Sequence, residues 1–562
     1  MKGVLTVTAI DIEVGASRPS AVLDDAHVGD IRGALGTIRV DDIGARSTLS
    51  AKMKTLLAVV GPGLIVMIGD NDAGAFSTYG QAGQNYGTKL LWTLLLLIPV
   101  LYVNQEMVLR LGAVTGVGHV RLILARFGKF WGTFEAFALF VLNALTIVTE
   151  FIGITLAAGY LGVPKVIAVI LAAGVIISTA FTGSFRRFEQ VAMAFCAGSL
   201  LLIPLYMMSH PAGAQMARGF TTPAFPGGSG GIAPVMLLVI GIVGTTVAPW
   251  QLFFQQSYVV DKRITPRLMK YEKADLWIGI VIVVLGAAAV MGATAAAFAG
   301  SKGAGHFADS AGLARGVAAY AGHFAGALFA VALLDAAIIG AFAVSLSSAY
   351  AIGDVFGMNH SLHRGVGQAK GFYAIYAALI CGAAAVVLIP GSPLGLITEG
   401  VQVLAGLLLP IATVFLLLLC NDKVVLGPWV NGRKTNAFTA VVIWVLITLS
   451  VILTVSVVFP AISARQIMAI IGFCAAAALA AGGVLLGAGT RSAGRTGRAE
   501  RDAAADVTAY GDRMLWRMPP LSELPAPVLT GARKAGLIAL SGYLGMTMIL
   551  VVVKVILMAL GH

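Results

Sequence analysis

Long runs of apolar residues, separated by short polar segments, follow one another from residue 55 to residue 560. Most runs are about 20 residues long, the length that an α-helix needs to cross the hydrocarbon core of a bilayer. The runs are too long for transmembrane strands of about 10 residues. The pattern predicts an all-α polytopic membrane protein with about thirteen spans, at 55–83, 89–109, 133–160, 165–182, 188–208, 231–259, 275–299, 322–353, 371–390, 394–420, 437–459, 467–487 and 536–560.

The segments outside these spans are polar. Residues 1–50 contain Asp, Arg, Gly and Ser throughout, and we expect a largely disordered tail with at most a short strand or helix. Residues 488–534 form an Arg-rich linker. The expected units are spans 1–6 in 51–260, spans 7–10 in 261–430, spans 11–12 in 431–487 and a last span in 535–562.

Composition agrees with a membrane protein, because 58% of the 562 residues are hydrophobic and only 11% are charged. The net charge of +12 suggests a nucleic-acid partner at first sight. However, the basic residues lie between the apolar runs, where lysine and arginine set the topology. We therefore expect the lipid bilayer and no nucleic acid as a partner.

The distribution of positive charge predicts a cytoplasmic amino terminus. With that orientation, inside loops such as 262–273 and 423–434 are rich in lysine and arginine. The opposite loops carry only Lys89, Lys165, Arg218, Lys302, Arg315 and Arg465. This asymmetry is the one that the positive-inside rule describes.

Motifs for enzymatic chemistry are missing from the sequence. It contains no GxSxG, HExxH or Walker-type GxxxxGK[ST] motif, so we expect neither an enzyme nor an ATP-driven pump. The four cysteines lie in apolar runs without metal-ligand spacing and are interpreted as small buried hydrophobes.

The first span carries polar residues at mid-depth. Asp70, Asn71 and Asp72 lie between Pro62, Gly69 and Gly74 in the segment 61–83. A carboxylate inside a bilayer is costly and normally faces a cavity or an ion pathway. Glycines beside it weaken the helix, so that free carbonyls can help to hold a cation. The alternative is a glycine kink with one paired, structural aspartate.

The sixth span is interrupted as well, at 244–251, where Pro249 removes a backbone donor. Five spans separate the two interruptions. Broken first helices in two five-span halves are typical of inverted-repeat transporters, with the binding site at the membrane midplane. The alternative is that Pro249 only kinks a helix.

Five segments carry a family resemblance. Residues 61–74, GPGLIVMIGDNDAG, resemble the first helix of the Nramp family of divalent-metal transporters, and 244–257, GTTVAPWQLFFQQS, resemble its sixth helix. RLGAVTG at 110–116, together with 149–164 and 401–427, adds to the match. The resemblance covers about residues 55–430. It implies a LeuT-type fold with a 5+5 inverted repeat and discontinuous helices 1 and 6, plus additional C-terminal transmembrane helices.

Several residues depart from the family pattern. Ala75 replaces the asparagine of the Asp-Pro-Gly-Asn motif, and Ala248 replaces the methionine of Met-Pro-His. Gln255 stands where the family has a second histidine, and Ile147 stands in place of an aspartate near Glu150. This pattern is similar to the Nramp-related magnesium transporters, a bacterial branch, which implies the bacterial inner membrane as the location.

These departures suit Mg²⁺. Thioether sulfur favours softer transition metals, whereas Mg²⁺ prefers oxygen ligands and gives up its water reluctantly. We expect Asp72 to anchor a partly hydrated ion. The other candidate metal-site residues, which supply oxygen or leave room for water, are Asp70, Asn71, Ala75, Glu150, Thr246, Ala248, Gln251 and Gln402.

Three of these residues have structural alternatives. Asp70 could be a salt-bridge partner or a vestibule charge. Glu150 could pair with a basic residue, and Gln402 could bond to a neighbouring helix.

The expected function is uptake of a divalent metal cation, Mg²⁺ and also Mn²⁺, by alternating access, without proton coupling and by a monomer. The ion is then the substrate, and no cofactor is expected. The alternatives are a proton-coupled Mn²⁺/Fe²⁺ transporter of the same family, a sodium-coupled amino-acid carrier on the same scaffold, and a non-transporting sensor whose linker binds a partner.

Overall fold

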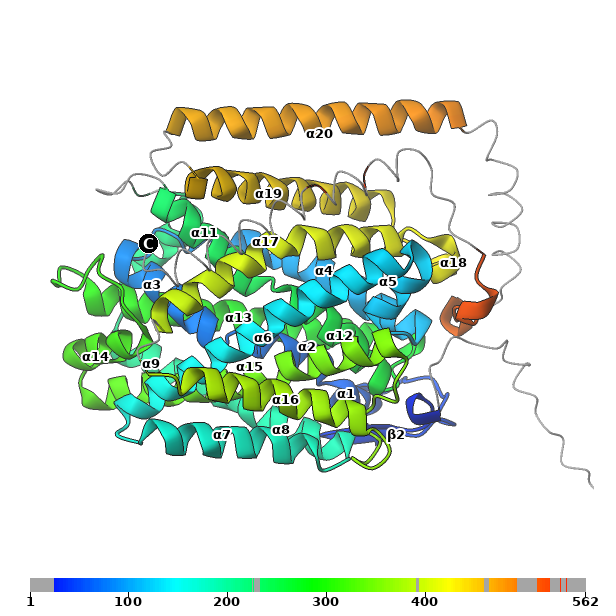
Figure 1. Cartoon of the computed structure of the whole chain (residues 1–562), viewed down its shortest axis with the longest axis horizontal. Helices are drawn as coiled ribbons and strands as arrows, with labels where there is room; N and C mark the ends of the chain where they lie inside the picture. Colours follow the sequence, from blue (N-terminus) through cyan, green and yellow to red (C-terminus); the bar gives the residue numbers. More distant parts are fainter. Residues whose placement is uncertain are drawn as a thin grey trace, which may run out of the picture.

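The computed structural model describes residues 25–224, 226, 233–390, 394–458, 464–492, 513–525, 536 and 542. The expected last span at 536–560 therefore lies almost wholly outside the described residues, as does most of the predicted linker. The described residues form a helical bundle (Figure 1).

The α-helices are α1 (Leu49–Val59), α2 (Pro62–Ile68), α3 (Ala73–Tyr86), α4 (Trp92–Thr115), α5 (His119–Phe127), α6 (Lys129–Tyr160), α7 (Lys165–Ala180), α8 (Phe185–Gly198), α9 (Leu202–Ser209), α10 (Gly213–Thr221), α11 (Ala233–Thr246), α12 (Pro249–Asp261), α13 (Met269–Phe298), α14 (Ser310–Ala321), α15 (His323–Phe356), α16 (Lys370–Val387), α17 (Leu394–Cys420), α18 (Lys423–Leu426), α19 (Arg433–Val458) and α20 (Ala464–Ser492). The 3-10 helices are η1 (Asp25–His27), η2 (Ser199–Leu201), η3 (Pro266–Leu268), η4 (Gly427–Trp429), η5 (Arg513–Leu515) and η6 (Leu521–Glu523). Strands β1 (Ile31–Gly33) and β2 (Gly36–Ile38) form an antiparallel hairpin in which Ile31 pairs with Ile38.

Nine helical segments in the described part of the chain are long and apolar enough to cross a membrane, and the bent pair α1–α2 adds a tenth. Helices lie at the predicted spans as far as these residues reach. Four shorter helices, α5, α10, α14 and α18, lie in segments expected to be loops. Helix α10, for example, occupies part of the Gly/Pro-rich segment 209–230.

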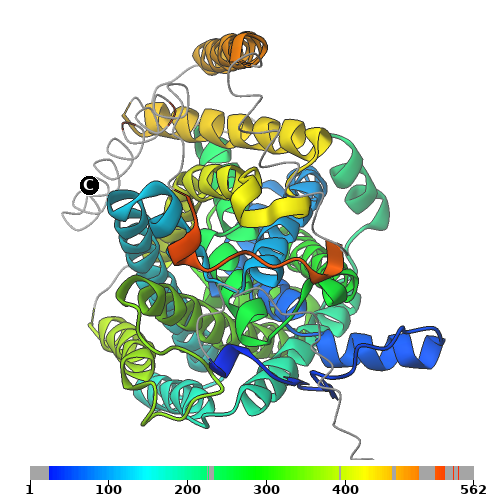
Figure 2. The same cartoon turned by 90° about the vertical axis from the view of Figure 1, so that its right-hand side faces the viewer.

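The helices run roughly parallel to one another, with α2, α13 and α15 inside the bundle and α19 and α20 along one edge (Figure 1). Helices α7, α8 and α16 form the opposite edge. The hairpin β1–β2 and the segment that contains η5 and η6 lie at the same end of the bundle, which Figure 2 views end-on. We call this end the hairpin face.

The first span is broken twice. The predicted break lies between α2 and α3, where Gly69–Asp72 leave the helix. A second break, which the sequence reasoning missed, separates α1 from α2 by a 53° bend. Gly61 makes this bend possible with a φ of +153°. Asp275 Oδ2 then caps α2 by accepting hydrogen bonds from Gly61 N (3.1 Å), Gly63 N (2.7 Å) and Leu64 N (3.3 Å).

The sixth span breaks as predicted. Helix α11 ends at Thr246 and α12 begins at Pro249, which occupies the first helical position. Proline is favoured there because its missing N–H would have no partner in the helix.

Residues 25–50, which lie in the expected disordered tail, include η1, the hairpin and the first residues of α1. Ile31 and Ile38 are buried. Gly33 and Gly36 lie so close to Ala58 that a side chain at Gly33 would collide with the Ala58 carbonyl. A few apolar residues and two glycines therefore anchor a segment whose average composition is polar.

Part of the predicted linker is also ordered. Trp516 and Met518 are buried, and Met518 N donates to Val114 O at 3.4 Å. These residues dock the η5–η6 segment on the end of α4.

Replacing Gly61 by alanine should destabilise the bend between α1 and α2. A Cβ at this position would collide with Glu189 Oε1 and would lie 2.9 Å from Lys262 Nζ. Gly87→Ala is the matched control, because Gly87 also has a positive φ (+62°) but nothing lies within 4 Å of the place that a Cβ would take. Left-handed backbone alone costs an alanine about 1–2 kcal/mol. We expect Gly61→Ala to lower the thermal unfolding midpoint in detergent more than Gly87→Ala; equal shifts would contradict a packed bend.

Candidate metal centre

The two helix breaks meet through Gln251. Its Nε2 donates a hydrogen bond to Asp70 Oδ1 in the first break and a longer one, at 3.4 Å, to Thr246 O in the second. Gln251 Oε1 accepts from Gln105 Nε2 of α4 at 2.8 Å, which fixes the orientation of the amide. The predicted residues Asp70 and Gln251 are therefore brought together.

Asp72 begins the second half of the broken first span. Its Oδ1 accepts from Ala75 N at 2.8 Å, so the carboxylate is the N-cap of α3. An N-cap carboxylate is favoured because it satisfies a free N–H at the positive end of the helix dipole. The break therefore also positions the acid that sequence reasoning placed at the centre of the site.

Glu150 of α6 lies beside Asp72. Glu150 Oε2 accepts from Ala73 N at 3.1 Å. Gly340 of α15 packs against both acids, because a Cβ at this position would lie 2.8 Å from Asp72 Cβ and from Glu150 Oε2. The hydrogen bonds and ion pairs found for the described residues join no lysine or arginine to Asp72 or Glu150. The alternative role of Glu150 as a partner of a basic residue is not seen here.

The electrostatics of this region favour a positively charged ligand. Asp70, Asp72 and Glu150 are each at most 3% exposed. Asp70 Oδ2 and Glu150 Oε1 are buried without a hydrogen-bond partner in the described part of the chain. A buried carboxylate without compensation costs several kcal/mol, so the group of acids calls for a cation or for bound protons.

The protein alone does not form a closed metal cage. Within the described residues, no three His, Cys, Asp or Glu side chains are arranged so that they could hold an ion by themselves. This donor set, with few carboxylates and several amides, fits an ion that keeps part of its water better than one that is fully dehydrated.

The two alanines of the predicted site, Ala75 and Ala248, are buried at the starts of α3 and α12. Thr246 lies nearby, but its hydroxyl donates to Ile242 O (2.6 Å) and pairs with Tyr79 OH (2.7 Å). Its backbone carbonyl, which accepts from Gln251, is therefore the atom of Thr246 that faces the break.

Of two further predicted site residues, Asn71 points away from the first break and Gln402 lies against it. Asn71 turns toward α13, where its Nδ2 donates to Val283 O at 3.1 Å and packs against Gly286. Its side chain thus serves helix packing in this structure, and its Oδ1 has no hydrogen-bond partner within the described residues. Gln402 of α17 lies directly against Gly74 in the first turn of α3.

Three neighbours of the site were missed by sequence reasoning. Gln105 is an amide at depth in a predicted span, the same signal that singled out Asn71. Ser347 Oγ donates to Trp250 O at 3.0 Å, and the Trp250 ring lies 3.7 Å from the position of a Cβ on Gly69. Gly340 has no signal in a single sequence, because its role depends on which helices meet.

A small hollow lies beside the first turn of α3. It is lined by α3, α6, α14 and α17, through residues that include Ala73, Ser77, Thr149, Asp309 and Thr398. Ala73 is adjacent to Asp72 in the chain. The hollow therefore lies next to the candidate centre.

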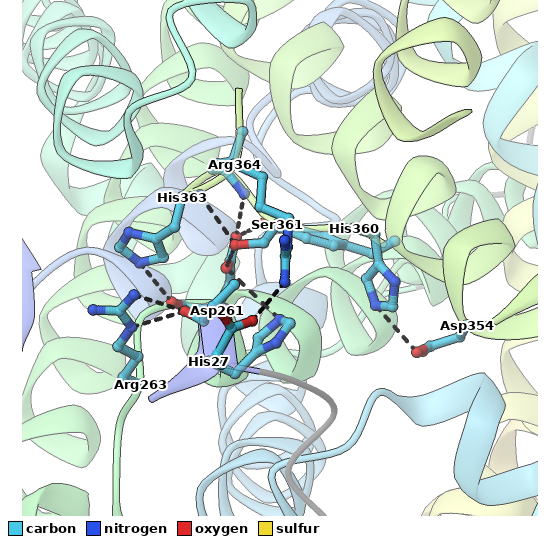
Figure 3. Close-up of polar contacts among 12 residues, drawn as sticks. His27, Asp261, Arg263, Asp354, His360, Ser361, His363 and Arg364 are labelled. Carbon is cyan, nitrogen blue, oxygen red and sulfur yellow. Dashed lines mark hydrogen bonds and ion pairs between the residues drawn. The ribbon is translucent and has the colours of Figure 1, made fainter. Parts of the chain in front are cut away.

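A second polar cluster lies at the hairpin face and is centred on Asp261 at the end of α12 (Figure 3). Asp261 accepts from Tyr350 OH (2.5 Å), Ser361 Oγ (2.5 Å) and Leu362 N (2.9 Å). His27 Nε2 lies 3.8 Å from Asp261 Oδ1. These contacts join α12 to α15, to the loop that follows α15 and to η1.

Two histidines of this loop have shifted pKa values in opposite directions. Burial lowers the pKa of His363, and the charge of Asp261 compensates only partly. Burial would also lower the pKa of His360, but the hydrogen bond and charge of Asp354, at 3.3 Å, raise it above its usual value. His360 therefore stays protonated to higher pH than His363.

Comparison with known proteins identifies the family. The model of the natural resistance-associated macrophage protein-like (Nramp) family matches residues 63–456. The chain belongs to the Nramp family. The predicted resemblance is thereby confirmed, and the chain is a multi-pass membrane protein of this family.

Several relatives are named as transporters. The chain is 30% identical over 272 residues to the divalent metal cation transporter MntH of Chromohalobacter salexigens, a match that covers 45% of this chain and 61% of the relative. It is 28% identical over 409 residues to MntH of Ralstonia nicotianae, covering 68% and 87%. The chain thus spans about three fifths of the length of the Chromohalobacter relative.

Solved structures support the fold class. A single-residue variant of the Eremococcus coleocola manganese transporter matches with a TM-score of 0.60 at 18% identity, covering 81% of this chain and 97% of that one. MhsT in complex with L-phenylalanine matches with a TM-score of 0.50 at 13% identity, covering 70% and 98%. The all-α, LeuT-type fold predicted from the sequence is confirmed.

Gly340→Ala should disrupt the candidate centre without changing any acid. The new methyl group would press on Asp72 and Glu150, and cores packed this tightly resist extra carbons. We expect at least about a tenfold loss of Mn²⁺ affinity, equivalent to about 1.4 kcal/mol, in calorimetric titration of the purified protein. Gly382→Ala in α16, where nothing lies within 4 Å, is the control. Unchanged affinity in Gly340→Ala would place the ion elsewhere.

Proposed function

We propose that this protein transports divalent metal cations, Mg²⁺ first and also Mn²⁺, across the bacterial inner membrane by alternating access. One observation carries the proposal: Asp70, Asp72 and Glu150 are buried where two broken helices meet, and two of their oxygens lack hydrogen-bond partners among the described residues. We propose further that the ion is the substrate, that the protein has no cofactor and no enzymatic activity, and that it works as a monomer.

The preference for Mg²⁺ follows from what the site lacks. Ala75 and Ala248 offer neither an amide oxygen nor a sulfur, and both are small. A site without a thioether gives no advantage to softer metals. Mg²⁺ needs octahedral oxygen coordination and keeps several waters, for which the two alanines leave room. Asp72 supplies the fixed charge, while Asp70, Gln251 and the Thr246 carbonyl accept hydrogen bonds from the ion's water.

The direction of transport is set by the membrane potential. An inside-negative potential contributes about 2.3 kcal/mol per charge and 100 mV, and thus about twice that for a dication. Uptake then needs no proton. Gln255, which cannot titrate, is fully buried, and both polar atoms of its side chain lack partners in the described part of the chain.

A second candidate is proton-coupled transport of Mn²⁺ or Fe²⁺. The observation that favours it is that Glu150 lies beside Asp72, because two adjacent buried carboxylates can share a proton. The relatives named as manganese or divalent metal transporters agree with either candidate. A sodium-coupled amino-acid carrier is disfavoured, because three buried acids would repel a substrate carboxylate.

Flux measurements separate the two candidates. Proteoliposomes with an internal pH dye and a potassium-diffusion potential should take up Mg²⁺ and Mn²⁺ without acidification. Asp72→Ala should abolish this uptake, whereas Asp335→Ala, an acid of α15 that lies against Gly198 of α8, should leave it measurable. Mn²⁺ uptake with acidification and without Mg²⁺ uptake would establish the second candidate.

The ligand argument has its own test. Ala75→Asn together with Ala248→Met restores the two side chains that the family motifs carry and that fill the space next to Asp72. We expect Mn²⁺ uptake relative to Mg²⁺ uptake to rise by about tenfold or more, which corresponds to about 1.4 kcal/mol. Competition between the two ions in the same liposomes measures this ratio. An unchanged ratio would refute the account of Mg²⁺ preference.

A further inference from the structure

The N-terminal segment crosses the hairpin face from one group of helices to another (Figure 2). On one side it is held by Arg263, which follows α12. Arg263 Nε and Nη2 donate to Ala26 O at 2.9 and 2.7 Å, and Nη1 donates to Asp30 O at 2.9 Å. Because the acceptors are backbone carbonyls, the arginine recognises the path of this segment.

On the other side the segment is held by α8 and by the loop after α15. Glu189 Oε2 accepts from Ala34 N at 2.5 Å, and Gln190 Nε2 donates to Ala34 O at 3.3 Å. Arg364 Nη2 bonds to Asp25 Oδ1 at 2.7 Å. The segment thus connects the end of a broken helix to helices outside the two breaks.

A buried ion pair lies beneath the hairpin. Lys262 Nζ is 2.7 Å from Glu189 Oε1, and both side chains are fully buried. The same ammonium donates to Val60 O at 2.8 Å, in the bend between α1 and α2. Glu189 therefore ties together the hairpin, the end of α12 and the start of α2.

The hairpin owes its order to this docking. An isolated two-stranded hairpin is marginally stable in water, and this one has three residues in each strand. Its buried anchors are Ile31 and Ile38, while Arg32 and Thr37 are exposed. A segment of this kind can detach as a unit when the surface beneath it changes shape.

We propose that residues 25–38, which we call the N-terminal latch, hold the hairpin-face end of the transport path closed, and that this end opens only when the latch detaches. The ends of α2 and α12 cannot separate from α8 and from the 361–364 loop while Glu189, Lys262, Arg263 and Asp261 keep their present partners. This inference rests on the proposed function only for the identity of the transported ion. The role of the latch in opening and closing this end does not depend on which ion is transported.

Cysteine accessibility tests the latch without using transport. Ser347 of α15 is fully buried and lies two turns, about 10 Å by helix rise, along α15 from Gly340 toward the hairpin face. Ser347→Cys, in a chain whose four native cysteines are replaced by alanine, reports opening of that end. A membrane-impermeant thiol reagent is added to inside-out vesicles, and the rate of labelling is measured.

Arg263→Gln with Arg364→Gln removes four hydrogen bonds to the latch. These hydrogen bonds exist in the closed state only, so their loss destabilises the closed state relative to the open one. We therefore expect labelling of Ser347→Cys to accelerate by about tenfold. The matched control is Arg186→Gln with Arg187→Gln, which removes two charges from exposed residues of α8 on the same face. Equal labelling rates in the two double variants would overturn the proposal.

A second arm covers a failure of the arginine variant to fold. Removal of residues 1–38 should also speed labelling, and a synthetic peptide of residues 25–38 should slow it again. Slow labelling of the shortened chain would equally overturn the proposal. If the latch variants open the path while the wild-type chain carries no divalent cation, the latch stands and the proposed function fails.

Discussion

The rest of this structure depends on one constraint: three carboxylates are buried at the centre of a membrane protein, and no lysine or arginine of the described residues pairs with them. Asp70, Asp72 and Glu150 would be prohibitively costly in an unbroken helix surrounded by apolar side chains. The breaks reduce that cost by supplying N–H donors, from Ala75 to Asp72 and from Ala73 to Glu150. They do not remove it, because two carboxylate oxygens have no hydrogen-bond partner in the part of the chain that the structure describes. The remaining free energy is available to a cation.

The breaks themselves are maintained from outside the centre. Asp275 caps the start of α2 with three hydrogen bonds, and Pro249 begins α12. Gln105 and Gln251 fix the distance between the two breaks. Each half-helix therefore has its own fixed end, which allows the halves to move as rigid pieces. At the hairpin face, the N-terminal latch covers the ends of α2 and α12.

Hydropathy was sufficient to predict the long helices of the described residues, because an apolar run of about 20 residues is the signal of a membrane-spanning helix. Glycine and proline beside Asp72 and Ala248 likewise marked both central breaks. The sequence could not indicate which helices meet, and so it missed Gly340, whose importance lies in its contact with two acids. It also missed the order of residues 25–38, where docking of two isoleucines and two glycines outweighs a polar composition. Asn71 was predicted to belong to the metal site, but its amide donates to Val283 O of α13. Which of these roles the side chain takes depends on helix packing, which a single sequence does not show.

The central claim is that a partly hydrated dication occupies the space between Asp72 and the two alanines. It is tested most directly by a structure of the protein with bound Mn²⁺, in which anomalous scattering identifies the metal. We predict one peak beside Asp72, with at least one water molecule between the metal and the protein and with Ala75 and Ala248 lining the space. A metal with only protein ligands, or a peak remote from Asp72, would contradict the account.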